Sequence, residues 1–118
     1  MGAKERARAK MNKTILSALS SLSAPVAFQT YSGNAETYIT FFTYLDKTEI
    51  YADDDELITG QYIQLDIWSK GDYTELVKEV HQNMKHTGFT KLNFYDLYEK
   101  DLKIYHKVMR YKLEKEEN

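Results

Sequence analysis

The chain has 118 residues, which is enough for one domain with one hydrophobic core and too few for two. Hydrophobic residues make up 42% and charged residues 29%, which excludes the compositions of disordered and fibrous proteins. Because no cysteine is present, a disulfide framework, a thiolate metal site and a cysteine nucleophile are excluded, and the formal net charge of −2 argues against a general nucleic-acid binder.

The N-terminal segment begins with basic residues and continues as an amphipathic pattern. We expect residues 1–10 to be a mobile basic extension and residues 11–118 to be one domain. Apolar residues recur at steps of three and four and predict a helix over residues 3–22, closed by Pro25: these are Met11, Ile15, Leu19 and Leu22. Serines interrupt this apolar run, and no segment approaches the roughly 20 apolar residues of a membrane span. We therefore predict neither a signal peptide nor a membrane helix, and a soluble protein.

Three strands are predicted after this helix. The sequence predicts a short strand in which Val26 and Phe28 alternate with Gln29, and further strands over residues 37–45 and 61–68. Ser32, Gly33 and Asn34 indicate a turn between the first two. Residues 46–56 lack periodicity and contain many acids, so we predict a loop there. In the third strand we expect one face to be core, namely Ile63, Leu65 and Ile67.

A second helix is predicted from its capping signals. Asp72 has the character of an N-cap residue, and Glu75 three residues later completes a capping box. Gly88 is placed to be the left-handed residue after the last turn. The apolar positions of this helix are expected to cover the core face of the third strand: Leu76, Val77, Val80 and Met84. Residues 89–98 and 103–113 then read as a final strand pair with a charged connection.

The resulting order is helix, three strands, helix, two strands. Consecutive strands imply hairpins, so we predict an α+β fold whose sheet is mainly antiparallel and carries the helices on one face.

The titratable residues do not form a recognised catalytic, cofactor-binding or metal motif. The acidic run at residues 53–56 lacks the ligand spacing of a calcium loop, and His81 and His86 are five residues apart and are expected on the surface. His106 alternates with apolar residues, which is typical of a hydrogen-bonded, partly buried histidine. Asp101 and Lys103 match the D-x-K pattern of many nucleases, but the acid falls in a predicted turn. We predict no catalysis, no cofactor and no metal.

Aromatic residues make up 14% of the chain, with ten tyrosines. Many lie on the strand face opposite the predicted core, where they either pack under a second layer or line an interface between subunits. We favour an interface, formed together with the acidic run. Its candidate residues are Tyr38, Phe42, Tyr44, Asp53, Asp54, Asp55, Glu56, Tyr62 and Trp68.

Several short stretches carry a resemblance to a known family. A strand that ends in Asp66-Ile-Trp-Ser-Lys-Gly71, the helix that contains Tyr73-Thr-Glu-Leu-Val77 and a late strand with Tyr105-His-Lys107 follow one another. Over about residues 26–113 this pattern resembles the tail-completion, or tail-terminator, proteins of long-tailed bacteriophages and prophages, which join tail to head. The family has no strict functional motif to carry over residue by residue.

The resemblance implies a structural protein without a cofactor. Such proteins self-associate into a ring, usually a hexamer, that caps the tail tube. The implied partners are the major tail protein and the head-completion or connector protein, with DNA only passing through a channel and no membrane contact. The implied location is the tail–head junction of the virion, and the host bacterial cytoplasm during assembly.

Two further hypotheses stay open. One is a small binding module for nucleic acid or protein, which would use the basic N-terminal arm together with exposed aromatic residues, because base stacking and phosphate neutralisation act together on single strands. The other is a nuclease, with Asp66 upstream of the D-x-K pattern.

Overall fold

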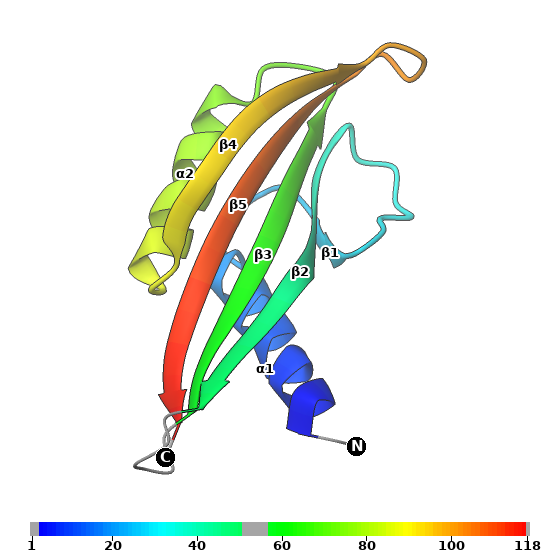
Figure 1. Ribbon diagram of the computed structural model, residues 1–118. Coiled ribbons are helices and arrows are strands. Elements are labelled where there is room, and N and C mark those ends of the chain that lie inside the picture. The colour runs from blue at the N-terminus through cyan, green and yellow to red at the C-terminus, as the bar shows by residue number, and fades with distance from the viewer. Residues whose placement is uncertain (1–2, 51–56, 118) are drawn as a thin grey trace.

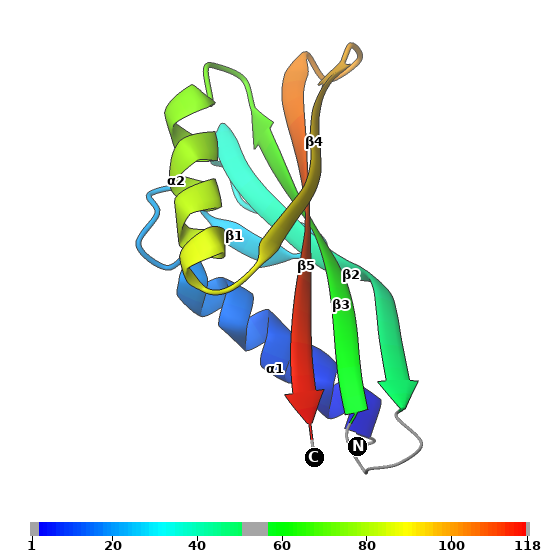
Figure 2. The same ribbon diagram turned by 60° about the vertical axis from the view of Figure 1, so that its left-hand side comes forward.

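The computed structural model describes residues 3–50 and 57–117. The elements are α1 (Ala3–Ala18), β1 (Val26–Phe28), β2 (Thr37–Ile50), β3 (Leu57–Ser69), α2 (Thr74–His86), β4 (Thr90–Glu99) and β5 (Ile104–Glu117), as Figure 1 shows. This order confirms the predicted α+β fold. Both helices lie on the same side of one sheet, so the protein has two layers (Figure 2).

The five strands form a single sheet in the order β1-β2-β3-β5-β4. The β2–β3, β3–β5 and β4–β5 pairs are antiparallel, as predicted. β1 differs, because it pairs with β2 in parallel, with Val26 opposite Ile39 and Phe28 opposite Phe41. The turn signal at Ser32–Asn34 therefore does not close a hairpin. Residues 29–36 instead carry the chain back past β1, so that β2 begins beside the start of that strand.

The β2–β3 hairpin is longer than the sequence predicted. We expected residues 46–56 to be a loop, but β2 continues to Ile50 and β3 already begins at Leu57. The pairing stays in register from Leu45↔Tyr62 to Ile50↔Leu57, and one bulge lies between Thr43 and Leu45. The sequence pattern did not predict this part of the hairpin, because a strand that is rich in charged residues shows no alternation of apolar and polar positions. Residues 51–56, which contain the acidic run, lie outside the described residues.

The core lies between the helices and one face of the sheet, which we call the covered face. The prediction for β3 is confirmed, because Ile63, Leu65 and Ile67 are fully buried and share one apolar cluster with α2. α1 adds Met11, Ile15 and Leu19 to this cluster. The remaining buried members are Ile39, Phe41, Val80, Met84, Phe89, Met109 and Tyr111.

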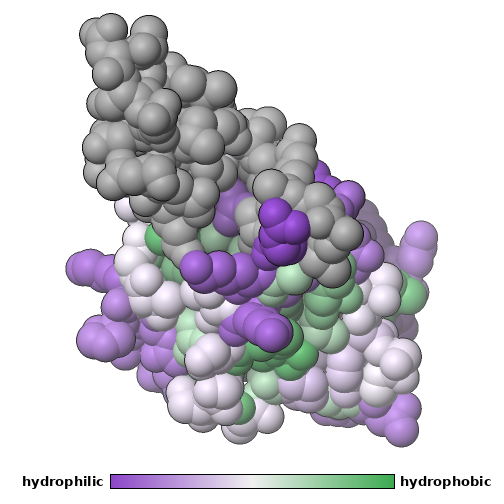
Figure 3. Space-filling model, turned by 90° about the horizontal axis from the view of Figure 1, so that it is seen from below, coloured by the Kyte–Doolittle hydropathy of each residue, from purple (hydrophilic) through white to green (hydrophobic). Residues whose placement is uncertain are grey.

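α1 is shorter than predicted and joins the core only in its second half. The helix ends at Ala18, and turns then lead to Pro25. Leu22 still packs against the core, although it lies beyond the helix. The helix runs continuously through residue 10, and the described side chains before Met11 are exposed. Whether residues 1–10 move stays a prediction. Leu16 is 42% exposed, and Figure 3 shows that apolar surface emerges between hydrophilic side chains at the lower end.

Only the N-terminal end of α2 differs from the prediction. The helix begins at Thr74 and its N-cap residue is Tyr73, whose side chain makes no cap hydrogen bond, so the predicted capping box with Asp72 at the N-cap is wrong. Asp72 instead accepts hydrogen bonds from the amide and the hydroxyl of Thr74, at 2.9 and 2.7 Å. At the other end Gly88 has φ +106° as predicted, and the amide of Phe89 donates to Met84 at 3.0 Å.

Candidate functional site

The second face of the sheet carries the candidate site, and we call it the open face. Paired residues of neighbouring strands point to the same face. Asp66 is opposite Thr40 and Val108, and Trp68 is opposite Tyr38 and His106. No helix of the described chain lies over this face (Figures 1 and 2). The open face comprises Tyr38, Thr40, Phe42, Tyr44, Tyr62, Gln64, Asp66, Trp68, Asn93, Tyr95, Leu97, Glu99, Ile104, His106, Val108, Arg110 and Lys112.

A row of stacked rings crosses the open face. The Trp68 indole stacks on the His106 imidazole with ring centroids 3.8 Å apart, and Tyr38 stacks on the other side of Trp68 at 6.3 Å. Tyr31, from the connection between β1 and β2, extends the row by stacking on Tyr38 at 4.5 Å. The Trp68 indole nitrogen donates to the Thr40 hydroxyl at 3.0 Å, which fixes the indole in its plane.

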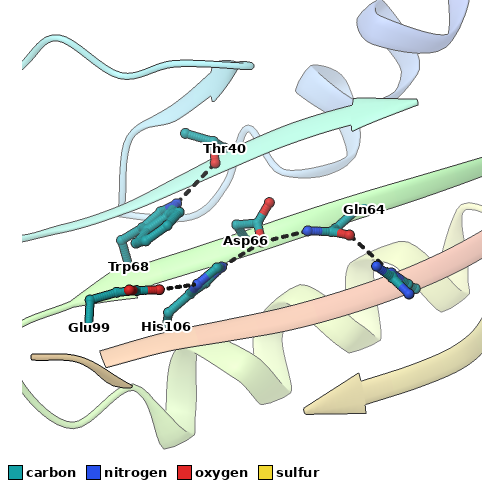
Figure 4. A network of polar contacts seen from close by, with 7 residues as sticks. Thr40, Gln64, Asp66, Trp68, Glu99 and His106 are labelled. Carbon is teal, nitrogen blue, oxygen red and sulfur yellow. Dashed lines mark hydrogen bonds and ion pairs between the residues drawn. The ribbon is translucent and has the colours of Figure 1, made fainter. Parts of the chain in front are cut away.

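Beside this row lies a buried charge cluster, drawn in Figure 4. Asp66 is 4% exposed and His106 is 7% exposed. The His106 Nε2 and the Asp66 Oδ1 are 2.6 Å apart, and the His106 Nδ1 lies 3.4 Å from the Glu99 Oε1. The Gln64 amide also donates to Asp66, and Arg110 donates to Gln64. The network therefore runs across β3, β5 and β4.

The geometry of this cluster suits a structural role. Each ring nitrogen of His106 has a carboxylate partner and Trp68 covers the ring, so no nitrogen of the imidazole faces an incoming substrate. The prediction that His106 is hydrogen-bonded is confirmed, and its side chain is buried more fully than the partial burial predicted. A buried charge needs such partners, because without them its desolvation costs several kcal/mol. Among residues 3–50 and 57–117, no group of three metal-ligating side chains has a suitable arrangement for an ion.

The sequence-predicted interface aromatics all lie on the open face. Tyr38 and Trp68 stack, and Tyr44 contacts Tyr62 with ring centroids 6.0 Å apart. Tyr44 is the extra residue of the β2 bulge and is 37% exposed, whereas the other four are partly buried. Because no described helix covers them, the alternative that they pack under a second layer is not supported by the structure. The acidic members of the candidate set, residues 53–56, lie outside the described residues.

Cations lie over several of these rings. The Arg110 guanidinium carbon is 5.1 Å from the centroid of Tyr44 and 5.7 Å from that of Tyr95, and the Lys112 ammonium is 5.7 Å from the ring of Tyr62. Such contacts contribute about 0.5–1 kcal/mol each at exposed sites. The long side chains of Arg110 and Lys112 thus take part of the covering role that a helix has on the other face.

A second cluster, which the sequence did not reveal, lies at the N-terminal end of α2. The Tyr73 hydroxyl donates to Asp96 of β4, and Lys107 binds the same carboxylate at 3.2 Å. Burial, followed by the hydrogen bond to Asp96, raises the pKa of Tyr73 to about 12. The hydrogen bond from Tyr73 lowers the pKa of Asp96. An open groove of about 590 Å³ adjoins this cluster, lined by Lys70, Gly71, Asp72, Tyr73, Asp96 and Tyr105.

His81 and His86 have different surroundings. His86 is exposed as predicted, but the surface prediction for His81 is wrong. Its Nδ1 lies 3.0 Å from the Tyr111 hydroxyl and its ring meets Phe94 edge-on, because the helix turns this position toward the sheet. Burial, together with Lys91 and Lys85, lowers the pKa of His81. The sequence signal that could have predicted this contact is that His81 lies four residues after Val77, on the apolar stripe of the helix.

Asp101 falls in a turn, as predicted, and Lys103 lies in the same turn, because the last strand begins at Ile104 and not at residue 103. Asp101 and Lys103 are exposed in the connection between β4 and β5, where Lys103 has φ +53°. Asp66 is the upstream acid of the nuclease hypothesis, and it is hydrogen-bonded to His106 and Gln64 within the sheet. The described helices include none with the length and apolar character of a membrane span.

No protein-family model matches the sequence, and no curated protein matches it significantly. A solved structure does resemble the fold. It is a chain from the structure of the virion of a native gene transfer agent (GTA) particle, with a TM-score of 0.55 and 8% sequence identity. The alignment covers 87% of this chain and 84% of that chain. At this identity the likeness shows a shared fold over nearly the whole length of both chains.

Proposed function

We propose that this chain is a structural protein of a phage or phage-like virion that caps the tail tube and joins it to the head connector, by self-association into a ring. The observation that carries the proposal is the likeness of the whole fold to a chain of a gene transfer agent virion, with 87% and 84% of the two chains covered. Because nearly the whole of each chain is aligned, the likeness concerns the complete fold and not one shared motif. The proposed location is accordingly the tail–head junction of the virion.

The open face supports the same proposal. It presents aromatic rings and long cations without a covering helix in the described chain, and aromatic residues and arginine are enriched in protein interfaces. Its polar groups are held in fixed positions by the Asp66–His106 contact and the Trp68 stack. A rigid surface loses little side-chain entropy when a partner binds. The proposed partners are further copies of this chain, the major tail protein and the connector.

The test is electron microscopy of particles produced without the protein. We expect tails that are unattached to heads or of uncontrolled length, and restoration of normal particles when the wild-type gene is supplied. Normal joined virions in the absence of the protein would contradict the proposal. Replacing Asp53, Asp54, Asp55 and Glu56 with serine should weaken tail completion without unfolding the domain, because a run of acidic residues without apolar side chains is not expected to contribute to a hydrophobic core.

A non-enzymatic role is part of the proposal. The substitutions Asp101→Ala and Lys103→Ala change exposed side chains of a turn and should leave particle assembly unchanged. His106→Gln should act only through stability. If the purified protein instead cleaves DNA in the presence of a divalent metal, and Asp101→Ala abolishes the cleavage, the protein is a nuclease.

A binding module for nucleic acid is the second candidate, and the exposed basic residues of α1 favour it. Arg6, Arg8, Lys10 and Lys13 are all exposed. Binding of single-stranded DNA by the purified protein, with affinity that falls steeply as salt rises and that is lost when these four residues become serine, would support this alternative. Salt-independent or absent binding would leave the virion role as the better proposal.

A further inference from the structure

Both lateral edges of the sheet have free backbone. Among the described strands, β4 is terminal, is ten residues long and pairs only with β5. On the opposite edge β1 is three residues long and pairs with Ile39 to Phe41, so β2 has no second partner among the described strands from Thr43 to Ile50. Such edges present unpaired amide and carbonyl groups that can accept another strand. The two free stretches have similar lengths.

Exposed apolar side chains gather at these same two edges. Nine large apolar side chains are exposed in the described part of the chain. Four belong to β4, namely Leu92, Tyr95, Leu97 and Tyr98, and two belong to the other edge, Phe28 and Tyr44. Long, exposed and apolar edge strands are usually avoided because they aggregate, unless a specific partner covers them.

A groove adjoins the free part of β2. It has a volume of about 260 Å³ and is lined by Arg8 and Asn12 of α1, Phe28 and Gln29 at the end of β1, and Phe42 and Thr43. It begins where β1 stops, so an added strand would continue along β2 past this groove. The neighbouring charges are opposite in sign: α1 has five basic residues and one acid, a formal charge of +4, whereas β4 has one lysine and two acids, a formal charge of −1.

We propose that a second copy of this chain adds its β4 edge to the β2 edge of the first, beside the groove of Phe28 and Phe42. Strand direction fits this contact. Because β2 and β5 run the same way and β4 runs opposite, β4 of one copy is antiparallel to β2 of a copy related by rotation about an axis along the strands. The contact is heterologous, so it repeats from copy to copy and closes into a ring where the rotation allows. The inference rests on the proposed self-association and specifies its contact.

Cysteine cross-linking tests the contact directly, since the natural chain has no cysteine. The test uses Tyr44→Cys with Tyr95→Cys, and Tyr44→Cys with Leu97→Cys, in the full chain. Within one copy β2 and β4 are three strand spacings apart, roughly 14 Å, which is too far for a disulfide. Oxidation should therefore give a ladder of covalent multimers on a non-reducing gel, for purified protein at high concentration and for assembled particles.

The cross-linking results distinguish the proposed β4–β2 contact from a symmetric β4–β4 contact. Single variants should remain monomeric, and dimers from Tyr95→Cys alone would show a symmetric β4–β4 contact and overturn the proposal. The absence of multimers for both pairs, in solution and in particles that contain the protein, would overturn it as well. If normal virions form without the protein while the purified variants still cross-link, the proposed function fails and the edge contact stands.

A charge placed on the edge gives an independent measurement. Leu97→Lys puts a cation on β4 where the side chain is 44% exposed, so the fold should tolerate it while strand addition is blocked. We expect the concentration needed for self-association to rise about tenfold or more, the scale of one unfavourable charge at an interface. Leu102→Lys, at a turn residue 70% exposed and outside β4, is the matched control and should not change association. Equal effects of the two substitutions would contradict the edge contact.

Discussion

Leu65 and Asp66 are consecutive residues of β3 and are both almost inaccessible, yet they are buried in different ways. Leu65 points to the covered face, where two helices exclude water and apolar groups fill the space. Asp66 points to the open face, where stacked rings and long side chains surround a network of polar contacts. The comparison shows that a sheet can bury a carboxylate without a second layer when its neighbours lie flat across the strands.

The largest expected effect belongs to the covered face. Leu65→Ala removes three carbon atoms from a fully buried side chain and leaves a cavity between β3 and the helices. We expect a loss of about 2–5 kcal/mol in the free energy of unfolding. Chemical denaturation followed by circular dichroism measures it. Phe42→Ala, on the partly buried open face, is the matched control and should cost less. A larger cost for Phe42→Ala would mean that the open face is the better packed of the two.

The next effect tests how the open face is held. Asp66→Ala leaves His106 and Gln64 without their shared acceptor, and we expect a loss of about 1–3 kcal/mol. Asp66→Asn keeps the size and one acceptor and should cost less. Ring stacking should change at the same time, because His106 supports Trp68, so the tryptophan fluorescence spectrum should shift in Asp66→Ala. A stability and a spectrum equal to those of wild type would show that the network does not hold this face.

The smallest effect lies at the groove near the start of α2. Tyr73→Phe removes the hydrogen bond to Asp96 and should cost about 0.5–1.5 kcal/mol near pH 7. Because the folded-state pKa of Tyr73 is raised to about 12, its stabilisation is fully present below about pH 10 and is lost as the pH rises toward 12. Denaturation at several alkaline pH values should show a smaller loss in Tyr73→Phe than in wild type.

The acid limb provides the control for this contact. The pKa of Asp96 is lowered, so its stabilising contribution is present above about pH 4, the ordinary range of the carboxyl, and is lost as the pH falls below it. Tyr73→Phe should reduce this acid dependence as well. If the variant and the wild type lose stability in parallel at both ends of the pH scale, the Tyr73–Asp96 contact does not contribute to folding in solution.

The covered face could be predicted because its pattern is periodic. Ile63, Leu65 and Ile67 alternate with polar residues, and the second helix has its apolar residues at helical spacing, so both surfaces were identified and each required the other. The C-terminal end of α2 could be predicted equally well, because Gly88 supplies the left-handed conformation there. Both signals come from neighbours in the sequence.

The open face could not be read in this way. Alternation places Asp66 outside, and its burial depends on His106, which comes forty residues later in the chain and is brought opposite by the β3–β5 pairing. The parallel pairing of β1 depends likewise on where the connection after Phe28 returns. The aromatic interface candidates were placed on one face correctly, but their ring contacts depend on the register of three strands.

The pairing of β3 with β5 also has a consequence for the order of folding. β2 with β3 and β4 with β5 are hairpins of adjacent strands, which close short loops, whereas Ser69 and Tyr105 meet only after the segment containing α2 and β4 has been enclosed. Long-range pairing costs more chain entropy and is typically slower. The two hairpins should therefore form first and dock afterwards. A change in Trp68 fluorescence, as its indole stacks on the His106 ring, would report that docking step in real time.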